Sequence, residues 1–83
     1  MNIKIKTGGL LGKYLPAGGN RNRAELEVPE GATPRDVIKL LNMPPTGTYL
    51  VIVNGDAVPP SEQASLSLVE NDTLAIMPPL KGG

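Results

Sequence analysis

The residues of this sequence that could take part in chemistry lie in the last four positions, Leu80-Lys81-Gly82-Gly83. The two glycines cannot cap a helix, because the preceding run has the pattern of a strand followed by prolines, and they have no side chains to pack. A glycine backbone is thin enough to enter a narrow channel and bring the Gly83 carboxylate to a reacting centre in another protein. Pro78 and Pro79 would keep the approach extended. The alternative is a frayed terminus with no function.

The composition excludes several other kinds of site. The 83 residues contain no cysteine and no histidine, which excludes disulfides, thiolate nucleophiles, imidazole bases and the usual zinc ligand sets. Eight basic and eight acidic side chains give a formal net charge of zero, so charge alone favours neither nucleic acid nor an acidic membrane surface as a partner. No apolar run approaches a membrane span in length, and no signal-peptide core is present. We expect a small cytoplasmic domain that binds no metal, cofactor, nucleic acid or membrane.

Two segments, residues 3–7 and residues 24–28, alternate apolar and charged side chains as half-buried strands do. The outward positions hold lysines on the first segment and glutamates on the second: Lys4, Lys6, Glu25 and Glu27. Antiparallel pairing would place opposite charges across from each other, which contributes a few tenths of a kcal/mol per pair. The charge pattern therefore favours a hairpin.

The Gly-rich connection, residues 8–23, is long for a hairpin loop. Its glycine and lysine at Gly12-Lys13 lack the spacing of a phosphate-binding loop. A helical turn over residues 11–15 would tuck its leucines against the sheet edge. Arg21 and Arg23 would be solvated or, alternatively, contact an acidic partner.

A helix start is indicated at Thr33, which suits the N-cap, with Pro34 in the first turn and Asp36 at the capping-box position. An apolar stripe with helical spacing follows and should face the core: Val37, Ile38, Leu40 and Leu41. Pro44 disfavours helical geometry at the residue before it, so the helix should end near Asn42.

The second half of the chain is rich in strand signals. Residues 49–53 form an apolar, β-branched run, which indicates a strand covered at least partly on both faces. Asn54-Gly55 is a strong hairpin signal, with a short return strand after it. Leu66, Leu68 and Val69 would cover the underside of the core, and residues 73–77 would form the last strand.

In chain order the expected elements are two strands, a helix, three further strands and the tail. A helix that links a hairpin to a later strand crosses one face of the sheet. Where it connects parallel strands, this crossover is almost always right-handed. We therefore predict an α+β fold of the β-grasp type, a small mixed sheet with one main helix and the last strand central and parallel to the first. Residues 1–79 would form the domain and residues 80–83 a flexible Gly-Gly tail.

The sequence resembles a family, the ubiquitin-like sulfur carriers of the MoaD/ThiS type. The resemblance rests on Thr33-Pro34-Arg35-Asp36-Val37 at the helix start, Val53-Asn54-Gly55 at the hairpin, Asn71-Asp72 before the last strand, and Leu80-Lys81-Gly82-Gly83 at the end. It covers nearly the whole chain and is weakest in the Gly-rich connection. The Met77-Pro78-Pro79 approach to the tail is most similar to the small subunit of molybdopterin synthase.

The resemblance implies a carrier and substrate protein, and no enzyme in its own right. An ATP-dependent activating enzyme of the ubiquitin-activating type would adenylate Gly83, and a persulfide or sulfide donor would convert it to a thiocarboxylate. The sulfur would pass to a precursor of the molybdenum or tungsten pterin, in a complex with the large subunit of molybdopterin synthase. ATP would bind to the activating enzyme and not to this chain.

Three alternatives remain open. The sulfur could go to thiamine or to another sulfur-containing metabolite. The chain could be a ubiquitin-like modifier that is joined through its Gly83 carboxylate to lysines of target proteins, since that reaction uses the same adenylate. It could also be a β-grasp interaction module whose tail has no function.

A partner surface is also predicted from strand parity. Alternate residues of a strand point to opposite faces, and one helix covers only one face of the sheet. If Val51 and Val53 face the helix, Leu50 and Ile52 lie on the open face; Ala75 and Met77 of the last strand would join them. These four residues would form an apolar patch beside the tail. The alternative is scattered exposed apolar residues with no function.

Overall fold

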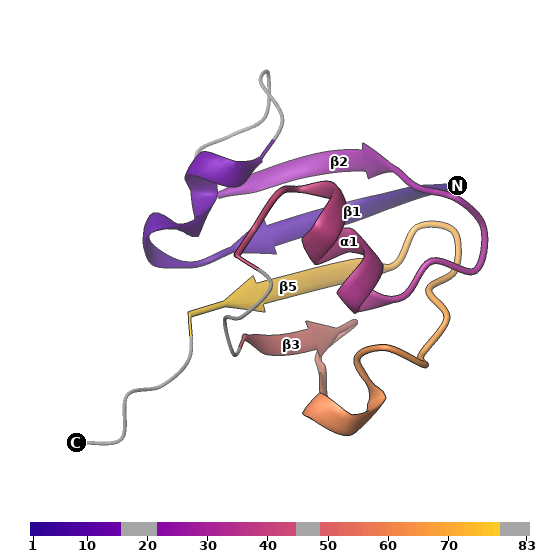
Figure 1. The fold of residues 1–83 in the computed structure, drawn as a ribbon. Helices are drawn as coiled ribbons and strands as arrows, with labels where there is room; N and C mark the ends of the chain where they lie inside the picture. Colours follow the sequence, from indigo (N-terminus) through magenta and orange to yellow (C-terminus); the bar gives the residue numbers. More distant parts are fainter. Residues whose placement is uncertain (16–21, 45–48, 79–83) are drawn as a thin grey trace.

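The computed structural model describes residues 1–15, 22–44 and 49–78 (Figure 1). It contains one five-stranded sheet, one α-helix and two short 3-10 helices. The strands are β1 (Asn2–Thr7), β2 (Arg23–Glu27), β3 (Leu50–Val53), β4 (Asp56–Val58) and β5 (Thr73–Met77). The helices are α1 (Pro34–Leu40), η1 (Gly9–Tyr14) and η2 (Pro60–Glu62).

The strand order in the sheet is β2-β1-β5-β3-β4. β5 lies in the centre, parallel to β1 and antiparallel to β3, while β1–β2 and β3–β4 are antiparallel pairs. Helix α1 crosses one face of this sheet (Figure 1). The predicted β-grasp architecture, with its central last strand, is confirmed.

The start of α1 follows from local chemistry. The Thr33 hydroxyl accepts a hydrogen bond from the Asp36 N–H at 3.2 Å, and the Asp36 carboxylate accepts one from the Thr33 N–H at 3.0 Å. This reciprocal capping box satisfies two N–H groups that a helix start leaves unpaired. Past the end of the helix, Asn42 takes a positive φ of 60°, and the chain turns away before Pro44.

The predicted helical stripe is right for three of its four residues. Val37, Ile38 and Leu41 are buried, but Leu40 is 52% exposed. Successive helical residues are rotated by about 100°, so the three buried side chains occupy a single arc and Leu40 falls beside it. A helix as short as α1 turns only one narrow face to the sheet.

The core between α1 and the sheet is aliphatic. Its innermost side chains are fully buried and come from β1, α1, β3 and β5: Ile3, Ile5, Val37, Ile38, Val51, Leu74 and Ile76. Leu68 is also buried and Leu66 packs against the cluster, as expected, but the expectation for Val69 is wrong because its side chain is 60% exposed. Each buried aliphatic side chain contributes about 1.5–3 kcal/mol relative to exposure.

A buried glutamine joins the two halves of the fold, and the sequence pattern does not predict it. Gln63 Nε2 donates hydrogen bonds to the backbone oxygens of Tyr49 at 3.2 Å and Val58 at 3.4 Å. Its Oε1 accepts one from the Arg35 guanidinium at 3.3 Å. The amide thus ties the start of α1 to β3 and β4.

The Asn54-Gly55 turn is confirmed as a tight hairpin between β3 and β4. Both residues have positive φ, 51° and 89°, as the favoured two-residue hairpin turns require. The Asn54 side chain donates to Asp72 Oδ1 at 2.8 Å and accepts from the Thr73 N–H at 2.9 Å. This turn therefore also fixes where β5 begins.

The capping box allows a stability prediction. Thr33→Ala is expected to lower the free energy of unfolding by about 1 kcal/mol, because it removes the acceptor for the Asp36 N–H.

The Thr33 backbone N–H, and secondly its hydroxyl, hold the pKa of Asp36 below its ordinary 3.8. A lowered folded-state pKa stabilises the fold above the unfolded pKa, and this contribution is lost as pH falls through the folded value.

Denaturant unfolding of Asp36→Asn at several pH values should show this pH dependence of the free energy of unfolding. This variant should be less stable than the parent at neutral pH, and the difference should shrink at pH values well below 3.8, where the parent carboxylate is also neutral. A difference that stays constant across this range would show that the charge of Asp36 is irrelevant to the cap.

Candidate functional site

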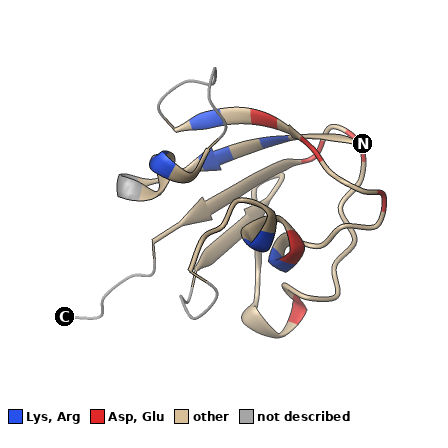
Figure 2. Ribbon diagram, turned by 45° about the horizontal axis from the view of Figure 1, so that its top comes forward, with Lys and Arg blue, Asp and Glu red and all other residues tan. Residues whose placement is uncertain are grey.

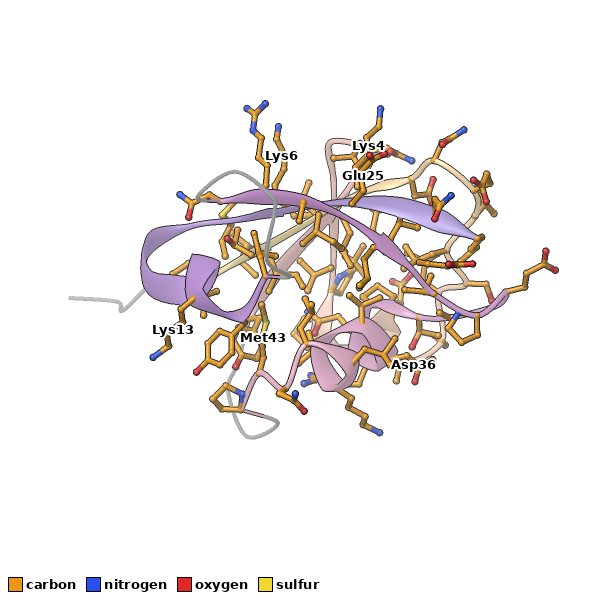
Figure 3. The ribbon with its side chains drawn as sticks, turned by 90° about the horizontal axis from the view of Figure 1, so that it is seen from above. Lys4, Lys6, Lys13, Glu25, Asp36 and Met43 are labelled. Carbon is orange, nitrogen blue, oxygen red and sulfur yellow. The ribbon has the colours of Figure 1, made fainter. Side chains whose placement is uncertain are left out.

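The sheet has one face covered by α1 and one open face. Figure 3 shows Lys4, Lys6 and Glu25 pointing away from the side on which Met43 and Asp36 lie. Since the side chains alternate along each strand, the outward residues of β1 and β2 define the open face across the whole sheet. The predicted partner surface belongs to this face.

The structure brings the four predicted patch residues together on the open face. In the antiparallel β3–β5 pair, Leu50 lies opposite Met77 and Ile52 lies opposite Ala75. Their inward neighbours also pair, with Val51 opposite Ile76 and Val53 opposite Leu74. The strand parity expected from the sequence therefore agrees with the register, and the role of the patch in binding stays a prediction.

Exposure within the patch is uneven. Leu50 is 40% exposed, and Ile52 and Met77 are half-buried. Ala75 is only 8% exposed, so the expectation that it contributes outward surface needs correction. Its methyl group is short, and it lies between Lys6 of β1 and Ile52 of β3, whose longer side chains stand on either side. Ala75 is thus the floor of the patch, and its neighbours form the accessible rim.

The strand that leads to the tail ends beside the first 3-10 helix. A Cβ atom on Gly8 would lie 2.7 Å from Met77 Sδ and 3.4 Å from Pro78 Cδ. The backbone before η1 therefore passes close against the end of β5, and Gly8 permits this approach. The sequence pattern does not single out Gly8, because a glycine in a Gly-rich connection carries no signal of its own.

The predicted C-terminal tail lies outside the described residues. It comprises the segment expected to enter the partner's channel, Leu80, Lys81 and Gly82, and the reacting residue Gly83. The description ends at Pro78, directly after β5. The predictions for these four residues therefore stay predictions. What the structure adds is the position of Met77, the last residue of β5, opposite Leu50 and hence within the patch.

The Gly-rich connection contains the expected helical turn, as the 3-10 helix η1. Leu11, Tyr14 and Leu15 are half-buried and pack against the core cluster. The side chain of Arg21 lies outside the described residues, whereas Arg23 is the first residue of β2 and is exposed. The loop leucines therefore cover one end of the core.

Charges on the open face differ from the expected arrangement. Lys4 lies opposite Glu25 as predicted, but Lys6 lies opposite Arg23 and not opposite a glutamate. Glu27 lies opposite Asn2. The long connection does not fix the hairpin register, and a shift by two residues keeps every side chain on its own face. Parity was therefore predictable from the sequence, whereas the partners were not.

The basic residues and the apolar strands lie next to each other. Figure 2 shows lysine and arginine on β1, β2 and η1, while β3 and β5 carry no charged residues. A hollow of about 500 Å³ joins the two regions, with Lys6 and Arg23 on one side and Ile52, Ala75 and Met77 on the other. Its floor is apolar and its β1–β2 side is cationic.

Aspartates can act as general bases or bind hard metal ions, but Asp36, Asp56 and Asp72 lie at a helix start or beside turns. Asp36 caps α1, and Asp72 accepts hydrogen bonds from the Val69 N–H and from Asn54, each at 2.8 Å. Asp56 is exposed beside the hairpin turn. Across residues 1–15, 22–44 and 49–78, acidic side chains form no group of three or more that could hold a metal ion. No helix in these same ranges is long and apolar enough to cross a membrane.

The comparisons with known proteins identify the family. The sequence model of the ThiS family matches residues 10–83, so the chain belongs to the ThiS family. A search of curated proteins finds no match. The fold and the family agree with the resemblance to MoaD/ThiS-type carriers.

Solved structures show the same fold at low sequence identity. A candidate molybdopterin converting factor subunit 1 from Pyrococcus furiosus superposes with a TM-score of 0.70 at 22% identity, covering 96% of this chain and 99% of its own. The small archaeal modifier protein 1 of Haloferax volcanii gives 0.68 at 19% identity, covering 95% and 98%. One chain in a complex of subunits 1 and 2 of molybdopterin-converting factor from Helicobacter pylori gives a TM-score of 0.62 at 12% identity. The match covers 100% of this chain and 100% of the matched chain.

These neighbours include both a modifier and components of molybdopterin-converting factors. The chain therefore has the fold shared by ubiquitin-like sulfur carriers and modifiers. The likeness in fold does not separate these functions.

Proposed function

We propose that this chain is a sulfur carrier whose Gly83 carboxylate is adenylated and then converted to a thiocarboxylate. The observation that carries the proposal is the ThiS-family match, which extends through the terminal Gly82-Gly83. Further support comes from the β-grasp body, in which the central strand β5 leads directly to the tail. The chain acts as a substrate of other enzymes.

The proposed chemistry is acyl activation. A carboxylate oxygen of Gly83 attacks the α-phosphorus of ATP, pyrophosphate leaves, and an acyl adenylate forms. Hydrosulfide can then attack the carbonyl carbon, AMP leaves, and the thiocarboxylate remains with release of a proton. If the donor is a persulfide, its terminal sulfur displaces AMP to give an acyl disulfide, and a second thiol reduces that bond to release the thiocarboxylate.

The chain itself supplies position and shape in this scheme. It has no cysteine and no histidine, so the nucleophilic sulfur and the acid–base groups belong to the partners. Its contribution is a narrow C-terminal segment that follows a strand of the sheet. Once this segment is bound in the partner's channel, the reacting carboxylate is held in position, which lowers the entropic cost of the reaction. ATP is bound by the activating enzyme.

We further propose that the sulfur acceptor is a precursor of the molybdenum or tungsten pterin. This proposal is supported by Met77-Pro78-Pro79 before the tail and by the two structural neighbours described as parts of molybdopterin-converting factors. In the Helicobacter pylori structure, subunit 1 is bound to subunit 2. A corresponding large subunit is the second partner that we propose for the open face of this chain.

Protein modification is the second candidate function. The structural likeness to small archaeal modifier protein 1 favours it, and both functions use the same adenylate. The two differ in the final nucleophile, which is a sulfur atom for a carrier and a lysine amine for a modifier. Isopeptide-linked conjugates in the host would support the modifier; their absence together with a thiocarboxylate would support the carrier.

Reconstitution with ATP tests the proposal directly. The full chain, mixed with the adenylyltransferase of the same organism and ATP, should form a covalent AMP adduct and release pyrophosphate. A matched chain that ends at Lys81 should keep the domain intact and form no adduct, because the carboxylate no longer reaches the same position. Equal adduct formation by both chains would contradict the assignment of Gly83.

A further inference from the structure

The open face of the sheet carries a like-charge pair in the β1–β2 hairpin. Lys6 and Arg23 lie directly opposite each other in the β1–β2 pair. Like charges opposite each other across strands are destabilising. A neighbouring position of the same hairpin shows the favourable arrangement, because Lys4 lies opposite Glu25.

The sequence offers a register without this conflict. Moving the pairing by two residues would place Lys6 opposite Glu25 and Lys4 opposite Glu27, with all side chains on the same faces. The observed register is held by backbone bonds at both ends of the hairpin. The Val28 N–H donates to the Met1 oxygen and the Thr7 N–H to the Asn22 oxygen, each at 2.8 Å. The fold thus accepts two adjacent cations where two ion pairs were possible.

The two cations adjoin the patch. Lys6 lies opposite Ala75 in the β1–β5 pair, and Ala75 lies opposite Ile52 in the β5–β3 pair. The row therefore runs from Arg23 through Lys6 and Ala75 to Ile52, and these residues line the same hollow of about 500 Å³. Within the strand pairs of the sheet, the residues opposite Lys6 are Arg23 and Ala75, so neither cation lies across from a carboxylate.

Resting on the proposed function, we propose that this hollow binds an acidic side chain, Asp or Glu, of the enzyme that activates the tail. The carboxylate would lie between the Lys6 ammonium and the Arg23 guanidinium, and the partner's adjoining apolar groups would cover Ile52 and Ala75. Charge-assisted hydrogen bonds to a carboxylate are stronger than neutral ones, and arginine can make two in parallel. Repulsion between the two cations in the free chain becomes shared attraction in the complex.

The test compares charge removal at three positions. Lys6→Gln and Arg23→Gln should each weaken binding to the purified adenylyltransferase of the same organism about tenfold at low salt. Lys4→Gln is the matched control, because it removes the same charge from the same strand and face but faces Glu25. Its binding should change less than twofold.

Stability provides the second readout. Arg23→Gln should be as resistant to denaturant as the parent or slightly more so, because the like-charge pair is gone. A purely structural role would instead make binding and stability fall together.

Three outcomes would overturn the inference. Normal binding by both glutamine variants would exclude the site, and an equal loss for Lys4→Gln would reduce it to general charge attraction. The variants would still be adenylated at saturating enzyme in the first case, which leaves the proposed function intact. If the parent and the Lys4→Gln control both fail to bind and to form an adenylate, the proposed function and this inference fail together.

Discussion

Gly82→Val is expected to fold like the parent chain and to lose adenylation by at least about a hundredfold, a loss of the size that follows when reacting atoms are displaced by about 1 Å. The valine side chain widens a segment that must enter a narrow channel, and its branched Cβ restricts the backbone angles that glycine allows. Pyrophosphate release in the presence of ATP and the activating enzyme measures the effect.

A matched valine substitution outside the tail gives the control. Ser67 is exposed and lies between η2 and β5, so Ser67→Val should leave both folding and adenylation unchanged. If Gly82→Val is adenylated at the parental rate, the tail does not thread through a narrow channel. In that case the terminal glycines need another explanation.

Ile52→Glu is expected to lower the affinity of this chain for the activating enzyme and for the large synthase subunit, each by about a hundredfold. A carboxylate at position 52 would be buried against the apolar groups of each partner, and it would also compete with the activating enzyme's acidic side chain for Lys6 and Arg23 in the same hollow. About 2.7 kcal/mol already corresponds to a hundredfold in affinity. The fold should survive, because Ile52 is half-buried on the open face while its neighbour Val51 fills the core. Titration calorimetry with each purified partner measures the loss.

Val69→Glu is the matched control for this experiment. Val69 is 60% exposed, lies in the connection before β5 and does not line the hollow that contains Ile52, so the same change of an exposed apolar residue to glutamate should leave both affinities unaltered. We also expect the two partners to compete for the chain, since both would cover Leu50 and Met77. Parental affinity of Ile52→Glu for both partners would show that docking uses another face.

Local signals explain why much of this fold could be predicted from the sequence. The Thr33 capping box and the Asn54-Gly55 turn each depend on a few adjacent residues, and both are confirmed. Alternating side chains likewise gave the correct open-face parity of β3 and β5. The central place of β5, parallel to β1, was expected from the β-grasp arrangement that the order of elements indicated, and it is confirmed.

Properties that depend on residues far apart in the chain were not predictable. The register that places Lys6 opposite Arg23 is invisible to a pattern with a period of two. Burial of Ala75 depends on neighbours from two other strands, and the hydrogen bonds of Gln63 connect three separate segments. Leu40 was misjudged because its spacing fits a helical stripe, while the face of α1 that meets the sheet is narrower.

The most direct measurement for the central claim is the intact mass of this protein isolated from its native host. We expect a species in which one oxygen atom of the Gly83 carboxylate is replaced by sulfur, and fragmentation should place that replacement in the C-terminal residue. The species should be missing in cells that lack the activating enzyme. A chain that carries only an unmodified carboxylate, in cells that are actively making the sulfur-containing cofactor, would contradict the sulfur-carrier function.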